Sequence, residues 1–345
     1  MVDVIETKEQ WMDNHDVFDI TIIGGGPSGL FAAFYAGLRA ARTKIIDSLP
    51  QLGGQLMALY PDKYIYDIPG FPKVLAKEFV DLQVEQAMKF SPTVCLDEKV
   101  THVQPLENGR LENGLIELRS ERGDVHLSRT VIVAAGVGAF VPRTLDIPDL
   151  QRLEGKGVHY FVKDLERFRG QRVLVVGGGD TALDWALALR DIAAQVTLCH
   201  RTDRFRAHED SVQALFQSPS EILLFHELKS LHGDLHLEGA TVFHNKSGDE
   251  RNLDLDAVIL GLGFLANLGP IQGWGLEIVK NSILVDTTMQ TNIPGVYAVG
   301  DITTYEGKLK LIATATAEAA IAANYAKNRI DPKSRVFPGH SSEKF

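Results

Sequence analysis

The sequence predicts an α/β protein built from two Rossmann-like nucleotide-binding domains, each with three-layer ββα architecture, the second inserted into the first. Three observations support this. A strand, a glycine loop, a helix and a second strand follow one another from Phe18. The same pattern recurs from Arg172. At 345 residues, the chain is also long enough for about two domains.

The first copy begins with a β-branched run, Phe18–Ile23, which ends at Gly24. A helical stretch, Gly29–Leu38, follows, and Thr43–Asp47 has the composition of a second strand. The second copy consists of a strand, a helix and a strand at Arg172–Val176, Thr181–Ile192 and Gln195–His200. The repeat indicates duplicated architecture and not a solenoid, because no short period recurs.

The segments around the second copy predict how the domains are connected. Val94–Val103 and Leu115–Ser120 read as a hairpin inserted into the first unit. Apolar strands at Thr130–Ala135 and Ala257–Leu260 are each followed by a connector, and we expect the two connectors, near Phe140–Leu145 and Ala266–Pro270, to form a two-stranded hinge. Gly295–Gly300 and Thr314–Lys327 would then complete the first domain. The expected domains are 1–141 plus 268–345, and 142–267.

Composition excludes several classes of function. With 45 acidic and 35 basic residues the formal charge is −10, which argues against a nucleic-acid-binding protein. No apolar run is long enough for a membrane span, and the acidic N-terminus lacks a signal-peptide core, so we expect no membrane association. Cys95 and Cys199 form no CxxC motif and the histidines no metal-binding cluster, so we expect no metal and a cytoplasmic location.

The first loop, Gly24-Gly25-Gly26-Pro27-Ser28-Gly29, matches GxGxxG between a strand and a helix. The first glycine permits the tight turn, the second lets the backbone approach a pyrophosphate, and the third lets helix and strand pack closely. A pyrophosphate would then lie at the helix N-terminus. Asp47 ends the next strand, where a carboxylate can accept hydrogen bonds from ribose hydroxyls.

The second loop, from Gly177 through Gly179, Asp180 and Thr181 to Ala182, has the GxGxxA form. Its second strand ends not in an acid but in a basic segment, His200-Arg201-Thr202-Asp203-Arg204-Phe205-Arg206. Guanidinium groups can bind a 2′-phosphate that a carboxylate would repel, so Arg201 and Arg206 favour NADPH over NADH. The alternative is a solvated basic loop.

Two nucleotide sites with no substrate domain between them imply that the two nucleotides react with each other. A nicotinamide donates hydride, and a flavin accepts it and passes electrons on singly or in pairs. The first site is therefore expected to bind FAD and the second NADPH, with hydride passing to flavin N5 before single-electron steps.

These motifs resemble the thioredoxin-reductase-like flavoprotein family over nearly the whole chain. The resemblance is carried by TIIGGGPSGL, GGQL at Gly53–Leu56, VVGGGDTALDWALAL, the HRxxxFRA segment and GVYAVGD at Gly295–Asp301. Thioredoxin reductases carry a redox CATC motif before the second loop, but the matching stretch here, Gly157–Asp164, has no cysteine. Without a dithiol no disulfide relay can operate.

In lacking the dithiol and in its segment Gly53–Pro72, the chain resembles the ferredoxin/flavodoxin–NADP⁺ reductases of this family. Membership implies a homodimer that exchanges electrons between NADPH and ferredoxin or flavodoxin. It implies that Tyr60 stacks on one face of the flavin, and that His340 or Phe337 of the C-terminal tail covers the other. The resemblance and the loops together give these FAD-contacting residues: Gly24, Gly26, Ser28, Gly29, Asp47, Gln55, Tyr60, Val100, Phe140, Asp301 and Ser342. The corresponding NADPH-binding residues are Gly177, Gly179, Asp180, Thr181, His200, Arg201 and Arg206.

Two other functions stay open at this point. One is an NADPH-dependent disulfide reductase that acts on an external dithiol, and the other is a regulatory protein that binds FAD and NADPH without turnover. No acid or base side chain is essential for hydride transfer, so binding and orientation would carry the catalysis. Lys308 and Lys310 read either as solvated lysines or as contacts for an acidic carrier protein.

Overall fold

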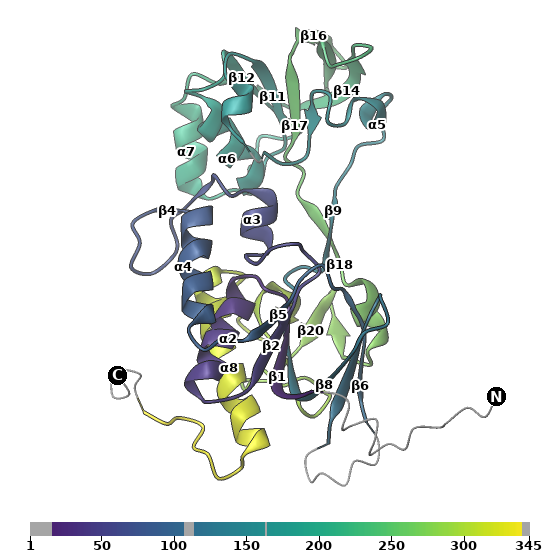
Figure 1. Ribbon diagram of the computed structural model, residues 1–345. Helices are drawn as coiled ribbons and strands as arrows, with labels where there is room; N and C mark the ends of the chain where they lie inside the picture. Colours follow the sequence, from purple (N-terminus) through teal and green to yellow (C-terminus); the bar gives the residue numbers. More distant parts are fainter. Residues whose placement is uncertain (1–15, 107–113, 163, 340–345) are drawn as a thin grey trace, which may run out of the picture. The chain divides into compact units, whose positions relative to one another are not determined.

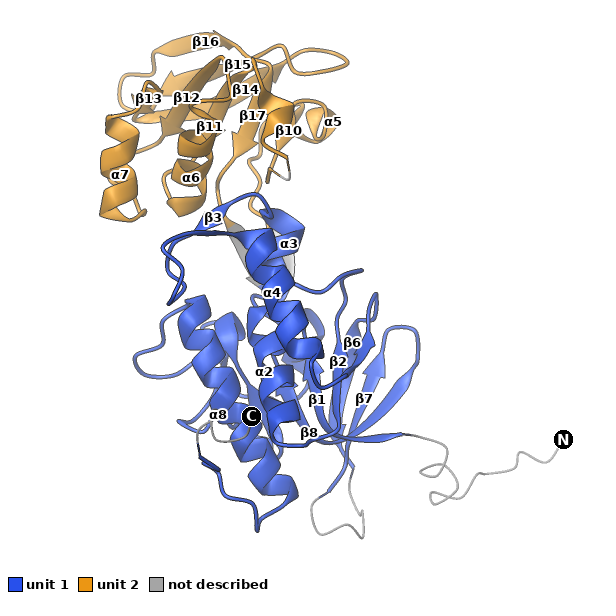
Figure 2. Ribbon diagram, turned by 60° about the vertical axis from the view of Figure 1, so that its left-hand side comes forward, with its two compact units in different colours: residues 1–139, 266–345 blue, residues 140–265 orange. Residues whose placement is uncertain are grey.

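The computed structural model describes residues 16–106, 114–162 and 164–339. The chain divides into two compact units, one formed by residues 1–139 and 266–345 and the other by 140–265 (Figure 2). The expected boundaries, after residues 141 and 267, fall two positions later than those observed after 139 and 265. Among the described residues no helix is both long and apolar enough to cross a bilayer.

The main sheet of the first unit has the strand order β5-β2-β1-β8-β7-β6, and β21 pairs with β8 as well. The strands are β1 (Val17–Ile23), β2 (Thr43–Ile46), β5 (Thr93–Cys95), β6 (Val100–Pro105), β7 (Ile116–Ser120), β8 (Val125–Val133) and β21 (Val296–Ala298). The central pairs are parallel, whereas β6, β7 and the first half of β8 form an antiparallel meander. Chain from the C-terminal third therefore completes the N-terminal sheet.

Helices cover one face of this sheet (Figure 1). They are α2 (Pro27–Leu38), α4 (Ala76–Met88) and α8 (Ile312–Ile330). Helix α8 buries a row of alanines, Ala315, Ala319, Ala322, Ala323 and Ala326. The small side chains let α8 pack closely on α2 and the sheet. The two helices and the sheet contribute to one apolar core.

Smaller elements complete the first unit. They are α3 (Gln55–Leu59), the hairpin β3 (Tyr64–Ile65) and β4 (Val74–Leu75), the turns η2 (Gly269–Gly273) and η3 (Gly300–Ile302), and a sheet of β19 (Ile278–Val279), β20 (Ser282–Leu284) and β22 (Thr303–Thr304). Helix α3 and the β3–β4 hairpin pack with α4 in a separate apolar cluster that includes Leu56, Phe79 and Val80.

The second unit has a five-stranded parallel sheet in the order β10-β17-β11-β12-β13. Its strands are β10 (Val158–His159), β11 (Arg172–Val176), β12 (Gln195–His200), β13 (Glu221–Leu224) and β17 (Ala257–Leu260). Within the unit, α6 (Asp180–Leu189) and α7 (Glu209–Phe216) lie on one side, and the meander β14 (His226–His232), β15 (Gly239–His244) and β16 (Glu250–Asp254) lies on the other (Figure 1). The turns α5 (Leu150–Leu153) and η1 (Glu166–Phe168) complete it.

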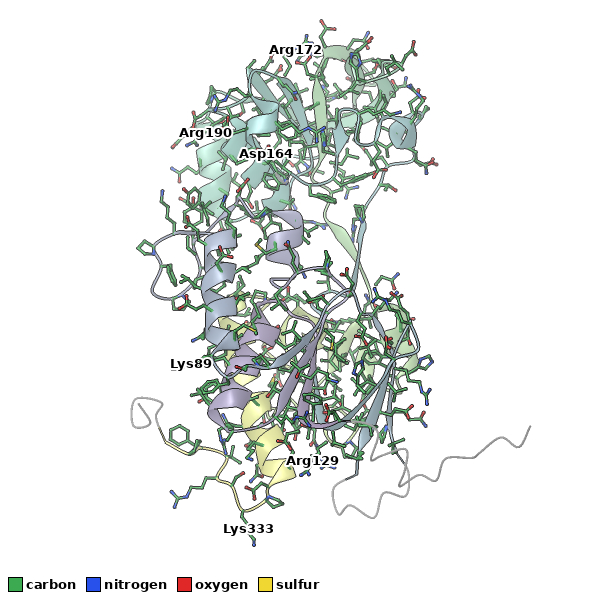
Figure 3. The ribbon with its side chains drawn as sticks, viewed as in Figure 1. Lys89, Arg129, Asp164, Arg172, Arg190 and Lys333 are labelled. Atoms are coloured by element: carbon green, nitrogen blue, oxygen red, sulfur yellow. The ribbon has the colours of Figure 1, made fainter. Side chains whose placement is uncertain are left out.

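Arg172, labelled in Figure 3, ties the start of β11 to the start of β17. Its guanidinium donates two hydrogen bonds to Asp256, at 3.0 and 3.1 Å, in the bidentate geometry that favours arginine over lysine. The guanidinium holds the pKa of Asp256 below its usual range.

The predicted fold class is confirmed, and several predicted elements match their bounds, including β11, β12 and β17. The prediction of a single strand over Val94–Val103 was wrong, because this segment forms the end of β5 and the start of β6, with a turn between them. In that turn Asp97 has φ +52°, a left-handed conformation that ends a strand. The connectors contain β9 (Ala139–Pro142) and β18 (Phe264–Asn267), which pair as a two-stranded sheet.

Candidate nucleotide-binding sites

The first glycine loop joins β1 to α2 and leaves room where the fingerprint requires it. Gly24 has φ +107°, and a Cβ there would lie 2.4 Å from the Ala134 carbonyl oxygen. At Gly29 a Cβ would lie 1.9 Å from the Gly24 carbonyl oxygen, so only glycine allows the helix and strand to pack this closely. A Cβ at Gly26 would meet only the Gly54 Cα, at 3.8 Å. The loop is therefore tight at Gly24 and Gly29 and open at Gly26.

Asp47 follows β2 and its side chain is buried against this loop. One carboxylate oxygen accepts a hydrogen bond from Gly25 N at 2.5 Å, and the other accepts one from Leu49 N at 2.8 Å. Burial raises the pKa of Asp47, while the two backbone N–H groups oppose that rise. Asp47 thus holds the glycine loop in place through the Gly25 N–H. Each of its oxygens retains a lone pair that can accept from a ribose hydroxyl.

The GGQL segment lies directly over the loop. A Cβ on Gly54 would come within 2.8 Å of the Gly26 Cα, so the two glycines bring their backbones into close approach. Gln55 begins α3, and its side-chain nitrogen would lie 2.9 Å from a Cβ at Gly136, which follows β8. Tyr60 directly follows α3 and is half-buried against the α3–α4 cluster, with Lys63 Nζ 5.5 Å from the centre of its ring.

The Gly300-Asp301 turn meets the same loop from the C-terminal part of the chain. Gly300 has φ +80°, and a Cβ there would lie 2.8 Å from Ser28 Oγ, in the first turn of α2. Burial raises the pKa of Asp301, and the nearby Lys310 and Lys308 oppose this. Within the first unit one site therefore brings together Gly24, Gly26, Ser28, Gly29, Asp47 and Gln55, with the turn that carries Asp301 beside Ser28.

Other predicted FAD residues are placed less directly. Val100 begins β6 and is buried in the core of the first unit. Phe140 belongs to β9. Phe337 is described, with 63% of the residue exposed, whereas His340 and Ser342 lie outside the described residues.

The second glycine loop, between β11 and α6, repeats the geometry of the first. Gly177 has φ +148°, and a Cβ there would lie 2.4 Å from the Gly261 carbonyl oxygen. At Gly179, which precedes α6, a Cβ would meet nothing within 4 Å. Thr181 lies in the first turn of that helix. A phosphate could therefore approach the open position at Gly179.

The basic segment after β12 folds back onto this loop. The N–H of Arg206 donates to the Gly178 carbonyl oxygen at 2.7 Å, and the His200 ring covers Gly178, where a Cβ would lie 2.1 Å from it. His200 also packs against Phe205, with ring centres 5.0 Å apart. Arg201 and Arg206 are exposed and make no ion pair with a described residue.

Asp180 has a structural contact that its predicted role did not include. Its carboxylate accepts a hydrogen bond from the backbone N–H of His208 at 3.0 Å. This bond joins the start of α6 to the end of the arginine segment. Asp180 therefore holds the chain beyond the arginine segment against the loop, and its role in NADPH binding stays a prediction.

Comparison with known proteins places these two loops in a family. The family model described as pyridine nucleotide-disulphide oxidoreductase matches residues 18–319. The chain belongs to this family of oxidoreductases. A ferredoxin–NADP reductase of Geobacillus thermodenitrificans is 52% identical over 334 residues, which cover 96% of this chain and 99% of the relative. A protein named ferredoxin–NADP reductase 2 from Shouchella clausii is equally similar, with 52% identity over the same shares of both chains.

Solved structures of the family have the same architecture. The thioredoxin reductase of Lactococcus lactis superposes with a TM-score of 0.79 at 26% identity, covering 91% of this chain and 99% of that one. The thioredoxin reductase of T. acidophilum has the same TM-score at 23% identity and covers 92% of this chain. The predicted thioredoxin-reductase-like fold is confirmed.

In this chain the family fold contains no thiol pair. The segment that would carry the redox cysteines includes β10, where His159 packs edge-on against Phe168 with ring centres 5.2 Å apart. Cys95 lies in the first unit and Cys199 in the second, and both are free thiols. Burial raises the pKa of Cys199 to about 12, so this thiol is unreactive at neutral pH. The chain cannot pass electrons through a disulfide of its own.

The residues present fit the two nucleotides that the sequence predicts. Each loop lies at a helix N-terminus and is open at one glycine, Gly26 in the first loop and Gly179 in the second. Within the described part of the chain, no group of His, Cys, Asp or Glu side chains could hold a metal ion.

Proposed function

We propose that this chain is an FAD-dependent oxidoreductase that transfers electrons between NADPH and a small one-electron carrier, ferredoxin or flavodoxin. The observation that carries the proposal is the pairing of two complete glycine-loop sites with the absence of any CxxC dithiol. Relatives with 52% identity over nearly the whole chain bear the name ferredoxin–NADP reductase. The sequence argues for the same chemistry independently of those names.

We assign FAD to the first unit. The loop from Gly24 to Gly29 would receive the pyrophosphate, Asp47 the ribose and Asp301 the ribityl region, while Tyr60 would stack on the flavin ring. When bound, FAD accepts hydride from a nicotinamide and releases electrons singly. The protein contributes orientation, exclusion of water and a matched electrostatic environment. His340 or Phe337 is proposed to cover the second face of the ring.

We assign NADPH to the second unit, with the pyrophosphate at Gly177–Thr181 and the 2′-phosphate at Arg201 and Arg206. Both guanidinium groups are exposed and are not neutralised by a carboxylate of a described residue, so they are available for a phosphate. His200 would form the wall of the site beside them.

The test is an anaerobic titration of purified protein with NADPH, followed by addition of ferredoxin or flavodoxin. We expect the visible absorbance of the oxidised flavin to bleach with NADPH and to recover when the carrier is added. Bleaching without recovery would point to another acceptor, and recovery with an added disulfide would favour a disulfide reductase. No bleaching at all would support a non-catalytic binding protein.

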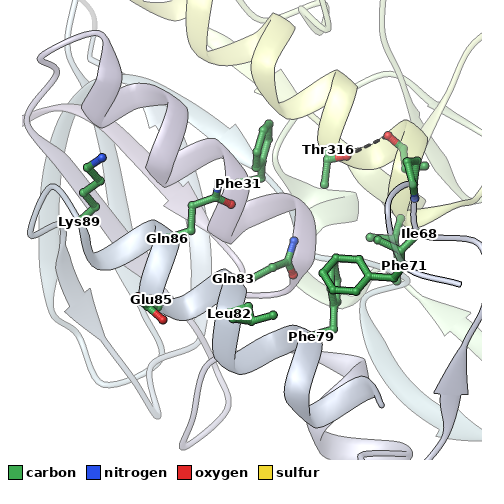
Figure 4. A pocket seen from close by; sticks show the side chains of 13 residues that line it. Phe31, Ile68, Phe71, Phe79, Leu82, Gln83, Glu85, Gln86, Lys89 and Thr316 are labelled. Carbon is green, nitrogen blue, oxygen red and sulfur yellow. Dashed lines mark hydrogen bonds between the residues drawn. The ribbon is translucent and has the colours of Figure 1, made fainter. Parts of the chain in front are cut away.

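We also propose that the protein is a cytoplasmic homodimer. A groove of about 900 Å³ opens on the first unit among α2, α4 and the start of α8 (Figure 4). Its apolar lining includes Phe31, Ile68, Phe71, Phe79 and Leu82. Leu82 is 50% exposed and Phe71 37% exposed, and both contribute to an apolar surface suited to contact with another protein.

Charges beside the groove suit a second copy of the same chain. Glu85 lies on α4 and Lys89 directly follows that helix, and both line the edge of the groove. In a two-fold interface the same patch meets itself, so Glu85 of one copy can face Lys89 of the other in both directions. An apolar centre with a self-complementary charged rim has the composition of a dimer contact.

The dimer proposal is tested by light scattering coupled to gel filtration. We expect the wild type to elute with twice the mass of one chain, and Leu82→Glu to shift the protein to the monomer because it buries charge at the centre of the contact. Leu235→Glu is the matched control, since Leu235 is 82% exposed in the second unit. A monomeric wild type, or an unchanged Leu82→Glu dimer, would contradict the proposal.

A further inference from the structure

We propose that Glu318, far from the glycine loop in sequence, is a positioning residue that fixes the Gly300-Asp301 turn for FAD. This inference rests on the FAD binding proposed above. Glu318 lies on α8 and its residue surface is 2% exposed. A carboxylate this deeply buried is stable only if its oxygens are well satisfied, so its partners indicate its role.

The two carboxylate oxygens of Glu318 accept hydrogen bonds from different partners. Oε2 accepts a hydrogen bond from the Gly300 N–H at 2.7 Å, while Oε1 accepts one from the Tyr305 hydroxyl at 2.7 Å and one from Lys308 Nζ. The Lys308–Glu318 pair is buried on both sides, with 6% and 3% of the side chains exposed. Lys308 is therefore neither solvated nor available to a carrier protein, which corrects both interpretations of its sequence.

The bond to Gly300 restrains the backbone at a flexible glycine, which has no side chain of its own to restrict it. Gly300 has φ +80°, a conformation that only glycine adopts without strain, and glycine gives the backbone the most freedom. A Cβ there would lie 2.8 Å from Ser28 Oγ of the first loop, and Asp301 directly follows Gly300 in η3. By holding the N–H of Gly300, Glu318 restricts the freedom of this turn before FAD binds.

Lys308 and Tyr305 satisfy the other oxygen and hold the carboxylate in this orientation. Burial and the bond to Glu318 raise the pKa of Tyr305 to about 12, as expected for a hydroxyl that donates to a carboxylate. Replacing a buried ion pair with apolar residues of similar size is often neutral, whereas removing one partner is strongly destabilising. The test therefore changes both partners together.

Two double variants separate positioning from folding. In Glu318→Gln with Lys308→Met, the amide oxygen can still accept from Gly300 N and the amide NH₂ can donate to Tyr305. In Glu318→Met with Lys308→Met, volume is kept but the acceptor for Gly300 is lost. We expect the first to bind FAD within about threefold of wild type, and the second to bind at least about tenfold more weakly.

The readouts are the FAD dissociation constant, from quenching of flavin fluorescence by the apoprotein, and circular dichroism and NADPH binding as checks of the fold. Equal FAD affinity in the two double variants would overturn the role of Glu318. If the Met/Met variant does not fold, Glu318→Asp, which shortens the side chain, is compared with Tyr305→Phe, which leaves the Gly300 bond intact. Weaker FAD binding only in Glu318→Asp supports the role, and equal affinity in both overturns it. If wild type itself binds no FAD, the proposed function fails instead.

Discussion

At the scale of single residues, hydrogen bonds between distant chain segments hold the side chains around both glycine loops. Asp47 accepts from the Gly25 N–H, and the Arg206 N–H donates to the Gly178 carbonyl oxygen. Asp180 accepts from the His208 N–H, and Lys308 donates to the Glu318 carboxylate. A hydrogen bond depends on where the partner's backbone passes, and distant chain segments decide that.

The arginine pair gives the first residue-scale prediction. Replacing Arg201 and Arg206 with alanine is expected to weaken NADPH binding about 100-fold, because two charge-assisted hydrogen bonds to the 2′-phosphate are lost. NADH binding should change by less than about threefold, since NADH lacks that phosphate. Isothermal titration measures both affinities.

Arg190→Ala is the matched control, since Arg190, labelled in Figure 3, directly follows α6. Its side chain pairs with Asp191 at 3.2 Å. It should leave both affinities unchanged. Equal loss of NADPH and NADH affinity in the double variant would refute the phosphate assignment.

His159 gives a pH prediction. Burial, with a smaller contribution from the nearby Arg167, lowers the pKa of His159 to about 4. Between pH 6.5 and 4 His159 binds a proton in the unfolded chain but stays neutral in the folded chain. The free energy of unfolding therefore falls as the pH drops through this range. The associated loss is on the order of 2 to 3 kcal/mol.

Thermal unfolding between pH 4.5 and 7.5 measures this effect. His159→Leu should show a smaller loss of melting temperature on acidification than the wild type. The control is His236→Leu, because the His236 side chain is 71% exposed. Identical acid sensitivity in wild type and His159→Leu would show that another group is responsible.

At the scale of elements, the glycine loops follow directly from local sequence, because a strand, a tight turn and a helix form within a few neighbouring residues. The strand boundaries between Val94 and Val103 did not, since the left-handed Asp97 separates two strands that belong to different pairings. The N–H of Glu98 donates to the Asp47 carbonyl oxygen, a contact between segments distant in sequence. Pattern alone cannot supply such a bond.

The glycines of each loop should respond differently to alanine. At Gly26 and Gly179 a Cβ meets no close neighbour, so Gly26→Ala and Gly179→Ala should fold normally but block FAD and NADPH respectively. Each methyl would occupy space the pyrophosphate needs, and we expect affinity to fall at least about tenfold.

Gly29→Ala and Gly177→Ala are the contrasting variants, because each Cβ would collide with a backbone carbonyl oxygen. They should lower the free energy of unfolding of the apoprotein by an amount typical of overpacking, about 1–3 kcal/mol, and so lower its melting temperature. Stability is measured by thermal melts and affinity by titration. Normal nucleotide binding by Gly26→Ala and Gly179→Ala would place the nucleotides elsewhere.

At the scale of the whole molecule, the chain has two nucleotide-binding units and no thiol pair within either. We therefore expect Cys95→Ala with Cys199→Ala to retain NADPH-dependent reduction of ferredoxin within about twofold, since no electron passes through sulfur. Steady-state rates with ferredoxin and with a one-electron dye provide the measurement. A tenfold loss with ferredoxin, at unchanged stability, would revive a thiol relay.

The sequence by itself determined the fold class, the two glycine loops and the missing dithiol, because each is a local property of neighbouring residues. Tertiary structure decided which distant groups complete the sites: Gly54 against Gly26, His200 over Gly178 and Glu318 on Gly300. Those contacts arise only when packing excludes water, and the buried charge of Glu318 then needs Lys308 and Tyr305 as partners.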